Sequence, residues 1–257
     1  MNILNIENLS KSYTERKLFD CADFSLQEGE KVGIIGINGT GKSTLLKALC
    51  GIIPADSGQV VLDGENILTL PQRQLAQRVA YLAQSRQVPD ITVERLVLHG
   101  RFPYLGYPRR YRKEDYAIAD AAMKTMGVAE LADELVQNLS GGQRQKVYIA
   151  MALVQDTPVI LLDEPTTYLD ISHQLQLMQQ ARMLAAQGKT VVMIIHDLPH
   201  AFQTADHMIL MRDGKIVADG TPEQIYATGM ISSVFGVRLC RTGTEGGWRY
   251  YCEESKL

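Results

Sequence analysis

Short apolar runs recur along the chain and alternate with longer stretches that have helical spacing. Residues 31–35 (KVGII), 158–162 (PVILL) and 190–195 (TVVMII) are apolar almost throughout, as expected of strands that are covered on both faces. Helical patterns occupy residues 43–50 and 172–186, after the first strand and between the other two. The order of strand, helix and strand predicts a parallel sheet with right-handed crossovers.

Two further stretches indicate antiparallel strands. The first is residues 58–64 (GQVVLDG). The second is residues 208–219, in which Asp213 and Gly214 separate two apolar arms, and that dipeptide is typical of a tight hairpin turn. The predicted fold class is therefore α/β with a small antiparallel β portion.

The middle of the chain has a different pattern, because residues 92–154 contain no convincing buried strand. Apolar residues there recur at helical spacing, at Ala119, Ala122, Met123 and Met126 and again at Val147, Ala150, Met151 and Val154. We therefore expect a helical subdomain at about residues 89–155, inserted into a core made of residues 1–88 and 156–257.

Composition and charge limit the kinds of protein that fit. The formal net charge is −3, whereas nucleic-acid binders usually carry a basic excess, so we expect no nucleic-acid partner. The four cysteines form no CxxC pair, which argues against a zinc site and agrees with a reducing cytosol. The polar N-terminus is unlike a signal peptide. The most apolar runs are four or five residues long, and a spanning helix needs roughly 20, so another chain would have to supply membrane spans.

Residues 36–44 (GINGTGKST) match the phosphate-binding pattern GxxxxGK[ST], and they follow a predicted strand and open a predicted helix. Glycines let backbone N–H groups close around phosphates, and the helix N-terminus adds its positive dipole end. Lys42 would place a charge near the β- and γ-phosphates, and the Ser43 hydroxyl could bind Mg²⁺. The nucleotide-binding residues expected here are Gly36, Asn38, Gly39, Gly41, Lys42, Ser43 and Thr44.

Two acids, Asp163 and Glu164, end a second apolar strand in the sequence VILLDEP. At the carboxyl edge of a parallel sheet such acids face the crevice where ligands bind. Asp163 would hold Mg²⁺ through water, and Glu164 would polarise the water that attacks the γ-phosphate. An isolated acid pair after a strand is usually a loop start or a helix cap, and its presence beside the phosphate loop favours nucleotide hydrolysis.

A second anion-binding helix N-terminus is predicted at residues 139–153 (LSGGQRQKVYIAMAL), where a Ser-Gly-Gly sequence opens an amphipathic helix. A bare Ser-Gly-Gly would be read as an ordinary helix cap with flexible glycines. Its position between the phosphate loop and the acid pair favours an anion-binding site over an ordinary cap. The residues concerned are Ser140, Gly141, Gly142 and Gln143.

With these motifs in this order, the chain resembles the ATP-binding subunits of ABC transporters over most of its length. Residues 139–143 (LSGGQ) resemble the family signature. In the family, an aromatic residue placed like Tyr13 stacks on adenine, and a glutamine placed like Gln84 reaches Mg²⁺ and senses the γ-phosphate. A histidine placed like His196 contacts the γ-phosphate. Residues 168–170, with Tyr168 first, match the loop after the catalytic glutamate.

The resemblance implies a RecA-like P-loop NTPase core, with ATP and Mg²⁺ as cofactors. It implies Glu164 and His196 as catalytic residues and a metal site formed by Ser43, Gln84 and Asp163. It also implies a head-to-tail homodimer that clamps two ATP molecules. Each ATP would lie between one phosphate loop and the partner's signature residues.

A narrower resemblance points to importers. Residues 163–174 (DEPTTYLDISHQ) and 99–107 (HGRFPYLGY) are similar to segments of importer ATPases for iron–siderophore, haem and vitamin B12 uptake. The resemblance implies an integral-membrane permease, an extracytoplasmic substrate-binding protein, and a cytoplasmic location on the inner face of the cell membrane. Importers of molybdate, tungstate, zinc or manganese stay open as alternatives.

Residues 101–113 combine five basic side chains with four aromatic ones and contain no acid. Three interpretations stay open: a solvated surface, a docking surface for a permease, and a nucleic-acid contact. Glu114 and Asp115 follow directly and keep the basic run short.

The competing function is a non-transport ABC ATPase. A DNA-repair type would need a long coiled coil in the middle, and a translation type would need two sets of motifs. An iron–sulfur assembly ATPase has a compatible length, so only residues 163–174 and 99–107 argue against it. A small P-loop kinase would leave the signature and His196 without a role.

Overall fold

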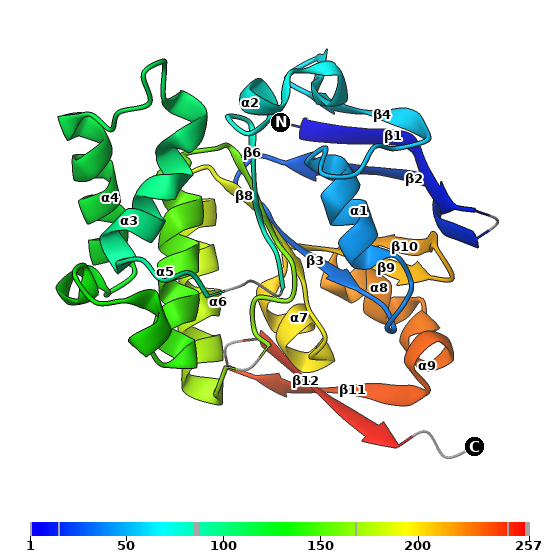
Figure 1. The fold of residues 1–257 in the computed structure, drawn as a ribbon. Helices are drawn as coiled ribbons and strands as arrows, with labels where there is room; N and C mark the ends of the chain where they lie inside the picture. The colour runs from blue at the N-terminus through cyan, green and yellow to red at the C-terminus, as the bar shows by residue number, and fades with distance from the viewer. Residues whose placement is uncertain (1, 15, 85–87, 168, 246, 255–257) are drawn as a thin grey trace.

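The computed structural model describes residues 2–14, 16–84, 88–167, 169–245 and 247–254. Within these residues the chain forms three β-sheets and a group of helices to one side of them (Figure 1). None of the described helices combines the length and the apolar character that a bilayer-crossing segment needs.

The central sheet has six strands in the order β10-β9-β3-β8-β7-β6. The strands are β3 (Lys31–Ile35), β6 (Val79–Leu82), β7 (Val159–Leu162), β8 (Thr190–Ile194), β9 (His207–Arg212) and β10 (Lys215–Gly220). All but β10 run parallel, so the predicted parallel sheet is confirmed. The Asp213–Gly214 hairpin is also confirmed, with φ of 49° and 75°, but β9 pairs in parallel with β3 on its other side. The predicted antiparallel piece at residues 208–219 is therefore confirmed, because β9 and β10 pair in antiparallel, and β9 in addition joins the parallel part of the sheet.

A second, antiparallel sheet has the order β2-β1-β4-β5. Its strands are β1 (Asn2–Tyr13), β2 (Arg16–Gln27), β4 (Ser57–Leu62) and β5 (Glu65–Asn66), followed by the short helices η1 (Ile67–Thr69) and α2 (Gln72–Leu75). One apolar core joins this sheet, the helix α1 (Lys42–Leu49) and the central sheet. Leu4, Leu45 and Ile34, one from each layer, are almost fully buried in it.

Every regular element in the described residues between β6 and β7 is a helix, apart from an isolated bridge between Thr92 and Leu135. They are α3 (Val93–Leu98), η2 (His99–Tyr104), α4 (Lys113–Thr125), η3 (Ala129–Leu131), η4 (Val136–Asn138) and α5 (Gly141–Val154). The expected absence of a buried strand at residues 92–154 therefore holds for the part that the structure describes. Figure 1 shows these helices packed together on one side of the central sheet.

The remaining helices are α6 (Ile171–Ala186), α7 (Leu198–Thr204), α8 (Pro222–Ala227) and α9 (Met230–Phe235). Both predicted helices, α1 and α6, are confirmed to within one residue. The chain ends in a two-stranded hairpin of β11 (Val237–Thr244) and β12 (Gly247–Glu254). Tyr250 fixes this hairpin to the rest of the molecule, because its ring lies 5.0 Å from the Phe202 ring and 5.8 Å from the Tyr226 ring.

Candidate functional site

Four neighbouring strands end at one edge of the central sheet, and each leads to a residue predicted for the site. The strands β3, β8, β7 and β6 lie side by side and run in parallel. Gly36 follows β3, His196 lies two residues after β8, Asp163 and Glu164 follow β7, and Gln84 lies two residues after β6. Open α/β sheets bind ligands at this edge, so the topology brings together residues that are distant in the sequence.

A cavity of about 430 Å³ lies at this edge. It is lined by Arg16, Leu18, Asn38, Gly39, Gly41, Lys42, Ser43, Thr44, Gln84, Glu164 and His196. Most of the phosphate loop, together with Gln84, Glu164 and His196, therefore faces one shared space. Gly36 and Asp163 are not among its lining residues, and Asp163 is only 2% exposed.

Glycine is required at two points of the phosphate loop. Gly41 has a φ of 92°, and a Cβ atom there would lie 2.0 Å from the Leu18 carbonyl oxygen of β2. A Cβ atom on Gly36 would lie 2.4 Å from the Met211 carbonyl oxygen of β9. Since any side chain would collide with backbone, only glycine lets the loop pack this closely against both strands.

The Lys42 side chain bridges the loop from inside. Its ammonium group donates to the carbonyl oxygens of Gly36 and Ile37, each at 2.8 Å. Burial lowers the pKa of Lys42, and the nearby carboxylates of Glu164 and Asp163 oppose that shift. The loop thus holds a partly desolvated cation beside the cavity, where it favours a bound anion.

Asp163 connects the loop to the central sheet. Its carboxylate accepts from the Ser43 hydroxyl at 2.8 Å and from the Tyr81 hydroxyl at 2.9 Å. Oxygen donors of this kind suit Mg²⁺, which usually takes one or two carboxylates plus substrate phosphates and water. No group of three or more His, Cys, Asp or Glu side chains in the described region could hold a metal by itself. The residues present therefore fit Mg²⁺ that shares its ligands with a nucleotide.

Glu164 is held between two of the residues predicted with it. One carboxylate oxygen accepts from the Gln84 amide, and the other lies 2.5 Å from Nε2 of His196. The Thr167 hydroxyl lies 3.4 Å from the same oxygen as Gln84. Glu164 has a φ of 49°, a left-handed backbone conformation that non-glycine residues seldom adopt outside functional sites and turns. The fold therefore fixes this carboxylate at the cavity wall.

The signature residues form the start of α5 but do not line the cavity. Ser140 caps the helix: its hydroxyl accepts from the Gln143 N–H at 3.3 Å, while the Gln143 side chain accepts from the Ser140 N–H at 3.0 Å. A Cβ atom on Gly142 would lie 2.8 Å from the His173 ring at the start of α6. Within one chain, this second helix N-terminus is fully capped, but it does not face the cavity of the phosphate loop.

Two further sequence predictions have different outcomes. Tyr13 is 73% exposed and does not line the cavity. Tyr168 lies outside the described residues. Arg16, which we did not predict, does line the cavity, and its guanidinium lies 3.5 Å from the Gly39 carbonyl oxygen. The only signal for Arg16 in the sequence is its position three residues after Tyr13, and this indicates nothing until β1 and β2 are known to pair.

The basic segment at residues 101–113 is not a uniform surface. Arg101 is partly buried, with a side chain only 12% exposed; it forms an ion pair with Asp115 at 2.9 Å and donates to the Val154 carbonyl oxygen at 3.1 Å. Arg109 instead lies over the Phe102 ring at 4.5 Å. A groove of about 500 Å³ opens here, with Arg109, Phe102, Tyr107, His99 and Arg73 among its lining residues. Arg101 is therefore structural, and only the later part of the segment is available to a partner.

Comparison with known proteins agrees with this geometry. The family described as ABC transporter matches residues 19–167, more than half of the chain. The chain is 42% identical to the ferric enterobactin transport ATP-binding protein FepC of Escherichia coli (strain K12) over 90% of this chain and 86% of that one. It is 39% identical to the iron(3+)-hydroxamate import ATP-binding protein FhuC of Bacillus subtilis (strain 168), over 92% and 89% of the two chains.

Solved structures give the same result for the fold. A metal-chelate type ABC transporter in an inward-facing conformation has a TM-score of 0.85 at 26% identity, covering 98% of this chain and 96% of that one. A dimeric, post-hydrolysis ATP-binding cassette bound to ADP and Pi has a TM-score of 0.75 at 27% identity, covering 86% and 99%. Motifs, strand order and relatives agree, and the chain belongs to the ABC transporter family.

Proposed function

We propose that this chain is the ATP-hydrolysing subunit that powers import of a metal chelate, an iron–siderophore complex, through a partner membrane permease. One observation carries the proposal: Glu164, Gln84 and His196 converge on a cavity whose other wall is the phosphate loop. The substrate class comes from relatives such as FepC and FhuC, whose names specify ferric enterobactin transport and iron(3+)-hydroxamate import.

The side chains have separate roles in this proposal. The loop N–H groups and Lys42 hold the phosphates, and Glu164 accepts a hydrogen bond from the attacking water and orients it in line with the γ-phosphate. His196 keeps the Glu164 carboxylate in place and contacts the γ-phosphate. Ser43, Gln84 and Asp163 would hold Mg²⁺. The bound ion would neutralise charge that develops on the phosphate oxygens.

A second copy of the chain would complete each site. Ser140, Gly141, Gly142 and Gln143 do not line the cavity of their own chain, and a related cassette is dimeric with ADP and Pi bound. We therefore propose a head-to-tail homodimer in which these residues face the partner's nucleotide. The subunit would lie on the cytoplasmic face of the cell membrane and depend indirectly on an extracytoplasmic substrate-binding protein.

Replacing Glu164 by Gln tests the proposed reaction. The amide keeps the shape of the side chain but cannot accept a proton, so we expect ATP hydrolysis to fall by about 10²–10⁴-fold. ATP affinity should stay near the wild-type value, because the phosphate loop is unchanged. Steady-state phosphate release and calorimetric titration with ATP measure the two quantities.

Glu130→Gln is the matched control, since Glu130 is an exposed glutamate in η3. It should hydrolyse ATP like the wild-type chain. Normal turnover in the Glu164→Gln variant would remove Glu164 from the catalytic role and with it the main support for the proposal.

We propose the groove beside η2 as the permease docking site. It lies where α2, from the core at residues 1–88 and 156–257, meets the start of the helical subdomain at residues 89–155. Arg73 and Gln77 both donate to the Pro103 carbonyl oxygen, at 2.7 and 2.8 Å, and hold the two sides together. Tyr107 is fully exposed at its edge. An exposed aromatic residue beside arginines is typical of a protein interface.

Charge reversal at Arg109 and Arg110 tests this docking site. We expect the variant to co-purify poorly with its permease while its basal ATP hydrolysis stays unchanged, because neither residue lines the nucleotide cavity. Arg112 is left intact, since its positive charge stabilises the Asp115 carboxylate at the start of α4. Reversal at Arg95 and Arg238, on other exposed surfaces, is the control, and equal co-purification of both variants would contradict the docking site.

A further inference from the structure

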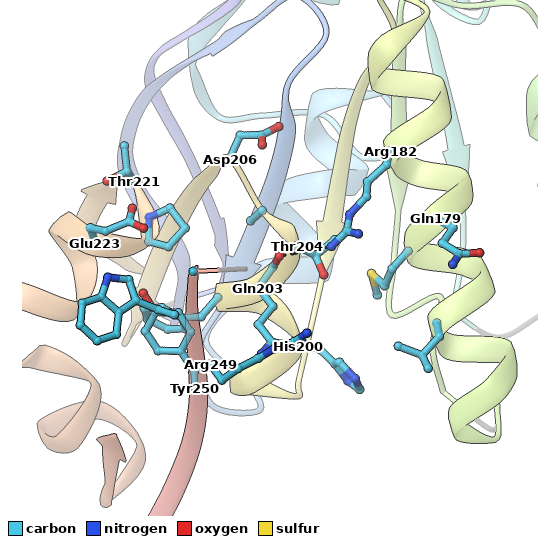
Figure 2. Close-up of a pocket in the computed structure, with 17 residues that line it drawn as sticks. Gln179, Arg182, His200, Gln203, Thr204, Asp206, Thr221, Glu223, Arg249 and Tyr250 are labelled. Carbon is cyan, nitrogen blue, oxygen red and sulfur yellow. Dashed lines mark hydrogen bonds between the residues drawn. The ribbon is translucent and has the colours of Figure 1, made fainter. Parts of the chain in front are cut away.

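A groove of about 750 Å³ lies between α6, α7 and β12, and none of its lining residues lines the nucleotide cavity (Figure 2). Its size falls within the range of small-molecule sites, about 300–1,000 Å³. Arg182 and Gln179 come from α6, Gln203 from α7, and Trp248 and Arg249 from β12. Three elements that are distant in sequence therefore present polar and aromatic side chains to one space.

Packing of the C-terminal hairpin creates this groove. Tyr250 is 7% exposed and anchors β12 against Phe202 of α7, and its buried hydroxyl has no hydrogen-bond partner in the described region. Its neighbours Trp248 and Arg249 remain exposed. The Arg241 guanidinium lies 4.1 Å from the Trp248 ring centre and supports the indole from one side. The anchor thus holds an aromatic surface and a cation at the rim.

Two guanidinium groups converge on Gln203 at the middle of the groove. Arg182 donates to the Gln203 backbone carbonyl, and Arg249 donates to the Gln203 side-chain oxygen, each at 3.4 Å. Neither arginine has a carboxylate partner among the residues that the structure describes. Each guanidinium has five N–H donors, so most of them stay available to a ligand.

The acids of the groove do not neutralise this pair. Asp206 is engaged by Lys31, with 2.5 Å between Nζ and a carboxylate oxygen. Figure 2 shows Glu223 beside Thr221, on the opposite side from Arg182. His200, which also lines the groove, lies 3.4 Å from the Asp197 carboxylate. The free charge next to Gln203 is therefore positive.

We propose that this groove binds a small organic anion, with carboxylate or phosphate groups held by Arg182 and Arg249 and an apolar part resting on Trp248. Planar guanidinium groups bind both kinds of oxyanion in a two-pronged geometry. α7 begins two residues after His196, and α6 begins after the loop that carries Glu164. The anion would therefore contact both helices that lead away from the catalytic loops, which makes the groove an effector site.

Trp248 allows a direct test, because it is the only tryptophan in the chain. Phenylacetate and phenyl phosphate, each with an apolar ring beside its anionic group, are titrated separately into the protein with its nucleotide cavity saturated with ADP and Mg²⁺, while Trp248 fluorescence is recorded. We expect a saturable change with at least one probe, and the tighter probe shows whether the groove prefers carboxylate or phosphate. Removing both guanidinium groups in Arg182→Gln/Arg249→Gln should weaken that binding about tenfold or more.

Arg95→Gln/Arg238→Gln is the control, because it also removes two positive charges, from surfaces outside both cavities. It should bind the probe like the wild-type chain. A melting curve without probe checks that the double variant is folded, and Arg249→Gln alone serves if it is not. The proposal fails if neither probe gives a saturable signal, or if the arginine variants bind with unchanged affinity.

Discussion

Arg16 places a second cation at the cavity that already holds Lys42. The two differ in what surrounds them: Lys42 is buried and bonded to two carbonyl oxygens of the loop, whereas Arg16 is exposed and only 3.5 Å from one. Lys42 therefore contributes to the shape of the loop as well as to its charge. Arg16 is free to reorient toward a bound phosphate or ribose.

Replacing Arg16 by Gln should weaken ATP binding by roughly 3- to 10-fold, because one charge-assisted hydrogen bond at a solvated site is lost. The rate at saturating ATP should change little, since Arg16 does not contact Glu164. Measuring KM and kcat separately distinguishes these effects. Lys17→Gln removes a neighbouring charge that pairs with Asp20 outside the cavity, and it should leave KM unchanged. Equal KM values for all three proteins would exclude Arg16 from the nucleotide site.

At the scale of elements, His207 joins three strands near the start of β9. Its ring lies against Asp219 of β10 and 3.7 Å from Glu30, which directly precedes β3. The hydrogen bond to Asp219 raises the pKa of His207, burial opposes the shift, and the Asp219 and Glu30 charges support it. The charged imidazolium therefore stabilises this edge of the sheet.

This linkage predicts a pH-dependent stability. A folded-state pKa above the ordinary value of about 6.5 gives a contribution that is complete below that pH. The contribution is lost as pH rises through the folded-state pKa. We expect His207→Gln to lower the urea midpoint most at pH 6 and progressively less toward pH 9. His99→Gln, at an exposed histidine, is the control, and a difference that stays constant with pH would contradict the role of His207.

The elements that could be predicted from sequence are those with an uninterrupted pattern. β3, the phosphate loop and α1 follow one another within 19 residues, Lys31–Leu49, and the apolar runs of β7 and β8 are fully buried. We did not predict β1 and β2. Their pairing shifts register several times, and Asn8 and Cys21 have positive φ. These irregularities break the alternation that identifies a strand.

The C-terminal hairpin was missed for another reason. Leu239 and Tyr250 are its only buried residues in the described region, so it carries almost no apolar pattern. The site shows the same limit. Glu164 was predicted from the end of an apolar strand, and Gln84 and His196 through a family resemblance, but their convergence depends on the strand order β8-β7-β6. Arg16 depends on the pairing of β1 with β2, and no local pattern encodes that.

At the scale of the whole molecule, the separation of the signature from the phosphate loop predicts complementation between two inactive chains. Lys42→Ala damages the loop, whereas Gly141→Glu adds a negative charge to the exposed signature face without removing the Ser140 cap. Each homodimer should hydrolyse ATP slowly. In a random mixture about a quarter of the sites should combine an intact loop with an intact signature, and activity should rise accordingly.

Phosphate release from the separate and mixed chains measures this effect. The control is a Lys42→Ala/Gly141→Glu double variant mixed with inactive Glu164→Gln chains. None of the sites in these mixed dimers has an intact phosphate loop, an intact signature and Glu164 together. A mixture of the two single variants that stays as slow as either alone would contradict the head-to-tail arrangement.

The contact between Gly142 and the His173 ring has a consequence for such a dimer. His173 belongs to α6, which follows the loop carrying Glu164, and Gln145 of α5 donates to the Pro165 carbonyl oxygen at 2.9 Å. These two contacts join the loop of Glu164, the carboxylate proposed to act in hydrolysis, to the surface that would face the partner in the proposed dimer. In the proposed dimer the two ATP molecules would not be independent. Loss of the γ-phosphate at one ATP site would change the other site through α5 and α6. The glycine at position 142 allows these two helices to approach closely.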